Sequence, residues 1–146
     1  MLHFVVYHNR DTMQRDASEL TGYSVVTTKP VSKAIGGRIW VITGRGQPRR
    51  YSLVHTFIAE QAGPLEGQPG VNKVCASTGD PVLESEVPLD DLEWFPDFRR
   101  ALGNFGLGFQ RLTNPRFIAG LEAAARGSRT SGLTYVAADG RSTNRT

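Results

Sequence analysis

Runs of apolar and β-branched residues alternate with glycine- and proline-rich connections along most of the chain. This pattern predicts β-strands over about residues 2–8, 23–28, 38–43 and 50–59. The last two runs are joined by the glycine-rich residues 44–49, a connection that is typical of a β-hairpin. We therefore expect one long hairpin in the first half of the chain.

Apolar positions at helical spacing predict several short helices. The first can be capped by Asn9 or Asp11, and it ends at Gly22. Pro88 and Pro96 can each open a further helix, because proline is tolerated at the first helical position, where its missing N–H is not needed. Since these helices interrupt the strands, the sequence predicts a mixed α+β fold.

The middle and the second half of the chain are predicted to continue the sheet. Residues 63–70 are rich in glycine and proline and are expected to form a surface loop. Residues 71–76 and 106–112 are expected to be strands, the second because its apolar positions alternate.

A last helix is predicted before the C-terminal segment. Asn114 and Pro115 place a capping residue before a proline at the first helical position, and the apolar face that follows ends at Gly127. Residues 127–146 contain few large apolar side chains, so burial would not offset the entropy of ordering them. We therefore expect a folded domain over residues 1–126 and a flexible basic tail over residues 127–146.

The composition is that of one globular domain. A chain of 146 residues with 39% hydrophobic and 21% charged side chains is expected to bury one core, and it has no apolar run of the ~20 residues that span a bilayer. Met1 to Tyr7 lack the basic start and the cleavage site of a signal peptide. Cys75 is the only cysteine, so no internal disulfide can form. These features predict a soluble cytoplasmic protein that makes no membrane contact.

The charge is uneven along the chain. The formal net charge is +3, arginine supplies 14 of the 17 basic side chains, and six acids crowd into residues 84–97. The planar guanidinium of arginine suits phosphate groups and base edges, so the bias is compatible with nucleic-acid binding. A GC-rich genome, in which arginine codons are frequent, explains the composition equally well.

The order of the elements resembles a known family. A strand and a helix at the start are followed by the hairpin Gly37-Arg-Ile-Trp-Val-Ile-Thr-Gly44 with Arg50-Tyr-Ser-Leu-Val54, and Phe109-Gln-Arg-Leu-Thr-Asn-Pro-Arg-Phe-Ile118 leads into the last helix. Over about residues 2–125 this order resembles a PUA-like domain, with the EVE branch nearest. The resemblance implies a strongly curved, mixed β-sheet or barrel flanked by short helices, with a pocket for a modified or flipped base. Relatives of this kind read modified DNA or RNA, and some bacterial ones act with a nuclease partner.

A pocket for an extracted base needs an aromatic or apolar wall and polar groups that read the base edge. Candidates for the wall are Tyr23, Trp40, Trp94 and Phe95, and candidates for edge reading are Ser24, Thr27, Thr28 and Ser77. Each also has a structural explanation. A tryptophan in the middle of a strand can be a core residue, and threonines at a strand end reflect β-propensity.

Phosphate contacts are predicted beside this pocket. The hairpin turn presents Arg45, Arg49 and Arg50, and Lys29 follows the threonines at the end of a strand. The alternative for the turn is a solvated hairpin tip. Arg99, Arg100 and Arg111 could extend the same surface, or they could pair with the acids of residues 84–97.

No recognisable catalytic motif is present, so we expect a protein that is not an enzyme and needs no metal or cofactor. His3 and His8 lie five residues apart on a predicted strand, which puts their side chains on opposite faces, and His55 lacks acidic or cysteine neighbours at metal-ligand spacing. Asp80 and the glutamates that follow it could form the carboxylate cluster of a minimal nuclease, but the lysine expected after the second acid is missing.

Two functions from different classes remain. The first is a non-catalytic reader of a methylated or hydroxymethylated base in DNA or RNA, linked to modification-dependent restriction. The second is a protein-interaction or assembly domain without a base pocket. A reader needs an open polar and aromatic pocket flanked by basic residues, whereas an interaction domain needs an exposed apolar patch.

Overall fold

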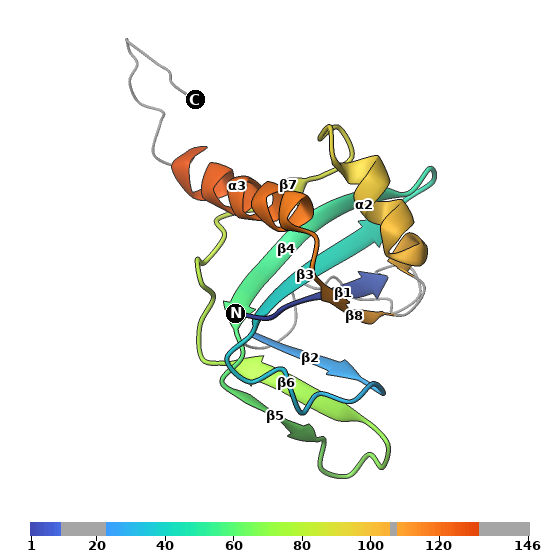
Figure 1. Ribbon diagram of the computed structural model, residues 1–146, viewed down its shortest axis with the longest axis vertical. Coiled ribbons are helices and arrows are strands. Elements are labelled where there is room, and N and C mark those ends of the chain that lie inside the picture. The colour runs from blue at the N-terminus through green and yellow to red at the C-terminus, as the bar shows by residue number, and fades with distance from the viewer. Residues whose placement is uncertain (10–22, 106–107, 132–146) are drawn as a thin grey trace.

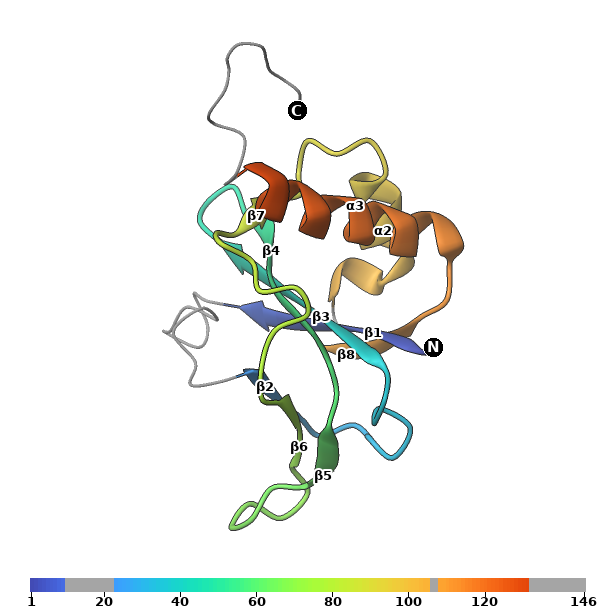
Figure 2. The same ribbon diagram turned by 90° about the vertical axis from the view of Figure 1, so that its left-hand side faces the viewer.

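The computed structural model describes residues 1–9, 23–105 and 108–131. These residues form three layers, with helices on one face of a five-stranded sheet and a three-stranded sheet on its other face (Figure 1). Figure 2 shows the same layers from the side, with the helices above and the smaller sheet below. The helix predicted after Asn9 or Asp11 lies outside the described residues.

The larger sheet contains the predicted hairpin. Its strands, in spatial order, are β7 (Val87–Pro88), β4 (Arg50–Ile58), β3 (Arg38–Arg45), β1 (His3–Asn9) and β8 (Phe109–Leu112). β1 and β3 run parallel, and the other neighbouring pairs are antiparallel. The hairpin and the first strand are confirmed, and the strand predicted over residues 106–112 occupies Phe109–Leu112.

A β-bulge interrupts the pairing of β3 with β4. Val41 lies opposite His55, whereas Ile42 lies opposite Leu53, so Val54 is an extra residue on β4. A bulge of this kind bends the strand and changes where the side chains around it point. Val54 packs in the core between the two sheets, and the ring of His55 contacts β2 of the smaller sheet.

The smaller sheet consists of β2 (Tyr23–Thr27), β6 (Asn72–Ala76) and β5 (Gln61–Pro64), in that order and all antiparallel. The strands predicted over residues 23–28 and 71–76 are confirmed. The loop predicted over residues 63–70 is wrong at its start, because Gly63 and Pro64 belong to β5. β5 is an edge strand, where the missing N–H of a proline is tolerated.

Two hydrophobic cores lie on either side of the larger sheet, because successive residues of a strand point to opposite faces. Toward the helices, Trp40 and Ile42 of β3 join Leu53 of β4 in a core. Toward the smaller sheet, Ile39 and Val41 of β3 pack in a second core. The other residues of this second core include Phe57, Val74 and Phe109.

The helical layer consists of α2 (Phe95–Ala101), the short 3-10 helix η2 (Gly103–Phe105) and α3 (Pro115–Ser131). α2 has Pro96 in its first turn, as predicted. α3 begins at Pro115 as predicted, and Oδ1 of Asn114 accepts a hydrogen bond of 2.9 Å from the backbone N–H of Arg116. The predicted end of this helix is wrong, because it continues past Gly127 to Ser131.

The prediction that Pro88 opens a helix is also wrong. Val87 and Pro88 form the edge strand β7, which pairs with Leu53 and Ser52 of β4. Both a helix start and a sheet edge tolerate a proline, so this residue did not distinguish between them.

The predicted α+β class is confirmed, but in the described part of the chain the sheets do not close into a barrel. β7 and β8 stand at the two edges of the larger sheet, and β2 and β5 stand at the edges of the smaller one. Among the same residues, no helix has the length and apolar character to cross a membrane.

Candidate functional site

Two of the predicted pocket residues lie in the core. Trp40 is 1% exposed and Phe95 is 2% exposed. Nε1 of Trp40 donates a hydrogen bond of 3.1 Å to Nδ1 of His3, whose ring lies nearly parallel to the indole. A base cannot stack on side chains that the fold already covers, so these two residues serve packing.

Trp94 is half-buried and lies between the helices. Its ring meets the ring of Phe98 edge-on, with centroids 5.3 Å apart. Gly120 of α3 lies so close that a Cβ atom at this position would be 2.6 Å from Nε1 of the indole. Trp94 therefore joins α2 to α3.

The remaining predicted residues divide between the two ends of β2. Tyr23 starts the strand, and Thr27 ends it. Oγ1 of Thr27 accepts a hydrogen bond of 3.0 Å from the backbone N–H of Lys29, which stabilises the turn after the strand. Thr28 is exposed in this turn. The threonines therefore do not lie in one pocket with Tyr23.

The structure brings Tyr23 and Ser77 together. Tyr23 pairs across the sheet with Ala76, and Ser77 follows that residue directly. Ser24, the neighbour of Tyr23, pairs with Cys75. Tyr23 and Ser77 therefore occupy the same end of the smaller sheet.

His55 and Gly79 complete this arrangement, which we call the Tyr23 site (Tyr23, His55, Ser77 and Gly79). The rings of Tyr23 and His55 meet edge-on with centroids 5.0 Å apart, and Phe57 lies 6.1 Å from Tyr23. A Cβ atom at Gly79 would be 3.1 Å from the Tyr23 ring, so the glycine lets the backbone approach the ring closely. Tyr23 and His55 are each half-buried.

Glu60 fixes the polar edge of the Tyr23 site. Its carboxylate accepts hydrogen bonds from the backbone N–H of Ser77, at 3.0 Å, and from the Ser77 hydroxyl, at 3.3 Å. Sequence reasoning missed Glu60, His55 and Gly79. The Ser-Thr-Gly sequence that starts at Ser77 could have indicated a close turn, but no local signal reveals which ring the turn meets.

The arginines of the hairpin turn have partners within the domain. Arg45 forms a two-pronged ion pair with Glu86, one of its hydrogen bonds being 2.9 Å long. Nε of Arg50 lies 3.4 Å from the carboxylate of Asp90. Nη1 of Arg49 donates a hydrogen bond of 3.3 Å to the hydroxyl of Tyr7. The acidic stretch after β6 therefore folds back on two of the three guanidinium groups that were predicted to contact phosphate.

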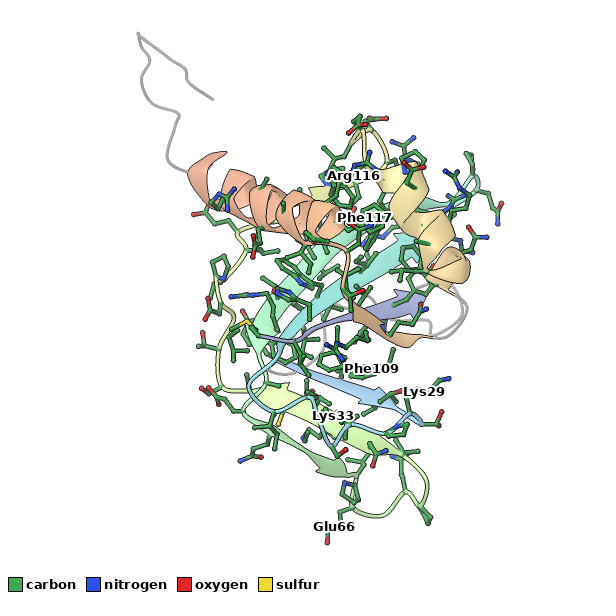
Figure 3. The ribbon with its side chains drawn as sticks, in the orientation of Figure 1. Lys29, Lys33, Glu66, Phe109, Arg116 and Phe117 are labelled. Atoms are coloured by element: carbon green, nitrogen blue, oxygen red, sulfur yellow. The ribbon has the colours of Figure 1, made fainter. Side chains whose placement is uncertain are left out.

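The lysines of the chain have a different environment. Lys29 and Lys33 lie on the connection that follows β2 (Figure 3), and Lys73 lies on β6. Within the described residues, none of the three forms an ion pair. The side of the molecule that carries the smaller sheet therefore presents basic groups that are not neutralised by neighbours.

Under α3, the polar side chains of His3, Arg38 and Thr56 form a cluster around Trp40. Its contacts are better explained by packing than by a catalytic or binding role. The guanidinium of Arg38 lies over the ring of Trp40 and donates a hydrogen bond of 3.1 Å to the hydroxyl of Thr56. Burial lowers the pKa of His3 below 6.5, and Arg38 lowers it further, while Glu122 acts in the opposite direction. His3 accepts from Trp40, so its neutral form is the one that fits the cluster.

In the described ranges, no group of three or more His, Cys, Asp or Glu side chains is arranged to hold a metal ion. Comparison with the models of known protein families, with curated proteins and with solved structures finds no match to this chain.

Proposed function

We propose that this chain is a non-catalytic nucleic-acid-binding domain of the PUA-like type, near the EVE branch, which reads a modified base at the Tyr23 site. The observation that carries the proposal is the half-buried Tyr23 ring, which meets the ring of His55 edge-on and lies close beside Gly79. The Ser77 hydroxyl and the Glu60 carboxylate lie at the same end of the sheet and supply hydrogen-bonding groups.

This arrangement supports the proposal because an extracted base loses its stacking neighbours. Only an aromatic surface and matched polar groups can offset that loss, which amounts to a few kcal/mol. Ser77 is already oriented by Glu60, so little further ordering is needed when a base edge arrives. In this proposal Tyr23 and Ser77 are retained from the predicted pocket, whereas Trp40, Trp94 and Phe95 have packing roles.

Phosphate contacts are assigned mainly to lysines. Arg45 and Arg50 are paired with carboxylates, so moving them to a phosphate would leave Glu86 and Asp90 without their partners. Lys29, Lys33 and Lys73 lose no ion pair when they approach a phosphate. A nuclease partner that acts on modified DNA, as the resemblance implies, remains part of the proposal.

The pairing of the hairpin arginines also supports a second candidate, a protein-interaction domain. Val26, Ile35 and Val82 are each at least 50% exposed and would supply apolar contacts to a protein partner. This candidate needs no opening beside Tyr23, and it predicts no preference for modified nucleic acid.

A binding screen distinguishes the two candidates. Oligonucleotides carrying cytosine, 5-methylcytosine, 5-hydroxymethylcytosine or N6-methyladenine, as DNA and as RNA, are titrated against the full chain. The proposal predicts that one modified oligonucleotide binds more tightly than its unmodified counterpart. Equal binding of every modified and plain pair would overturn the base reader and favour the interaction domain.

A further inference from the structure

Arg99 differs from Arg100 and Arg116 of the helical layer in the groups that hold it. Arg100 pairs with Asp97, and Arg116 pairs with Asp97 and Glu93. Arg99 has no carboxylate partner within the described part of the chain. Its Nε donates a hydrogen bond of 3.1 Å to Oδ1 of Asn104, and its Cζ lies 5.3 Å from the centre of the Tyr51 ring.

These two contacts orient the guanidinium without neutralising it. The hydrogen bond occupies Nε, and the aromatic face of Tyr51 supports the planar group from one side. The two terminal nitrogens remain as a pair of parallel donors. A half-buried arginine that is held in this way has already lost most of its rotamer freedom, so little entropy is lost when it binds an anion.

The backbone is strained where it presents Asn104. Asn104 has φ 55° and Phe105 has φ 65°, and both angles lie in the left-handed region that residues other than glycine seldom adopt. Phe105 is buried in the core under the helices, which holds the turn in place. The same turn places the side-chain carbonyl of Asn104 within hydrogen-bonding distance of Nε of Arg99.

A recess opens beside this arginine. Its volume is about 400 Å³, and its lining consists of Asp90, Phe95, Pro96, Arg99, Arg100 and Asn104. The one acid, Asp90, is compensated, because it accepts the backbone N–H of Tyr51 at 2.8 Å and lies beside Arg50. Arg100 is compensated by Asp97, so the charge of Arg99 dominates the recess.

We propose that this recess binds a phosphate group, with the terminal nitrogens of Arg99 donating two parallel hydrogen bonds to its oxygens. Arginine forms this bidentate arrangement with phosphate because the spacing of its donors matches the spacing of the oxygens. Asn104 acts as a positioning residue that keeps the guanidinium aimed into the recess. The inference goes beyond the base-reading function, since Tyr51 faces the helices and the Tyr23 site lies on the opposite side of the larger sheet.

The test is a titration of the full chain with inorganic phosphate at constant ionic strength, followed through the side-chain Nε–H resonance of Arg99. We expect saturable binding that Arg99→Ala weakens by about tenfold or more, since the charge and the fork are both lost. Arg99→Lys keeps the charge and is expected to restore only part of the affinity. Glycine at position 104 tolerates the left-handed backbone, and Asn104→Gly removes the side-chain carbonyl that orients Arg99. We expect this variant to weaken phosphate binding less than Arg99→Ala does.

Arg126→Ala is the matched control, because Arg126 is an exposed arginine of α3 outside the recess. It is expected to leave phosphate affinity unchanged. All variants are first checked for cooperative thermal unfolding, and if Arg99→Ala does not fold, Arg99→Lys carries the comparison. No saturable binding by the parent, or equal losses in the Arg99 and Arg126 variants, would overturn the proposal.

Two further arms identify the source of the phosphate. An unmodified oligonucleotide offers phosphodiesters, and a nucleoside monophosphate offers a phosphate monoester. If Arg99→Ala weakens the oligonucleotide as strongly as inorganic phosphate, the recess binds the nucleic-acid backbone. If Arg99→Ala weakens the binding of the monoester and of inorganic phosphate but not of the oligonucleotide, the recess binds a free phosphate group. Because none of these ligands carries a modified base, the result is independent of the base-reading proposal.

Discussion

Tyr23 of β2 meets His55 of β4 edge-on, with ring planes at 77° and centroids 5.0 Å apart. The contact joins the two sheets at the position where Val54 bulges out of β4. Without the extra residue, the alternation of β4 would be continuous and the side chains on one side of the bulge would point to the other face. The base-reading proposal therefore depends on an irregularity in the hairpin as well as on the aromatic residues themselves.

The contact between Trp94 and Gly120 predicts opposite effects for two similar substitutions in α3. Gly120→Ala places a methyl group against the indole, and we expect it to lower the free energy of unfolding by about 1–3 kcal/mol. Gly127→Ala has no atom within 4 Å of the new methyl group. It should raise the free energy of unfolding by up to about 1 kcal/mol through helix propensity.

Denaturant unfolding of both variants measures these changes. The two substitutions are chemically identical and lie in the same helix, so each serves as the control for the other. A Gly120→Ala variant as stable as Gly127→Ala would show that Trp94 does not rest on α3.

The buried His3 predicts a loss of stability in mild acid. Burial lowers the pKa of His3 in the folded state below its ordinary value of 6.5, with contributions from Arg38 and the N-terminus, and Glu122 opposes them. As the pH falls through 6.5, the unfolded chain takes up a proton before the folded one does, so folding becomes less favourable. Above that pH the contribution of His3 is complete.

Unfolding free energies of the parent and of His3→Gln, measured between pH 5 and 8, isolate this effect. We expect the stability of the parent to fall more steeply toward pH 5 than that of the variant. Parallel curves would mean that His3 titrates alike in the folded and unfolded states. Every other titratable group is present in both proteins, so the difference between the two curves reports on His3.

The unpaired lysines predict how nucleic-acid affinity depends on salt. Each phosphate that a lysine neutralises releases counterions, which contributes about −0.9 to the log–log slope on duplex DNA. Changing Lys29, Lys33 and Lys73 together to glutamine should therefore flatten the slope by about 2 to 3. Arg50→Gln is the control, and it should change the slope little because Arg50 already pairs with Asp90.

Affinities at four or five salt concentrations give these slopes. A parent whose affinity does not change with salt would contradict phosphate contact altogether. A larger change of the slope with Arg50→Gln than with the lysine variant would mean that the hairpin turn, and not the lysines, contacts phosphate.

Local patterns predicted most of the regular elements. Asn114 and Pro115 mark the start of α3 correctly, and runs of apolar and β-branched residues locate the hairpin and β2. Pro88 was misassigned because proline is tolerated both at the start of a helix and in an edge strand. Gly63 and Pro64 were misassigned because such residues also occur at the edge of a sheet.

The candidate site was harder to predict because it depends on contacts between residues far apart in the chain. Trp40 and Tyr23 are both aromatic residues of strands, and only the packing of the layers shows that the first is covered and the second is half-buried. The pairing of Arg45 with Glu86 spans a separation of 41 residues, so the turn alone could not show that its charge is compensated. Asn104 tolerates the left-handed region better than most residues other than glycine, but Phe105 carries no sequence signal for it.

The central claim is that the ring of Tyr23 distinguishes a modified base from a plain one. The most direct test is the ratio of affinities for the preferred modified oligonucleotide and its plain counterpart, measured for the parent, Tyr23→Phe and Tyr23→Ala after each has been shown to unfold cooperatively. We predict that Tyr23→Phe keeps most of the discrimination, and that Tyr23→Ala loses about 1–3 kcal/mol of affinity for the modified site while its affinity for plain nucleic acid changes little. A folded Tyr23→Ala protein that discriminates as well as the parent would contradict the account.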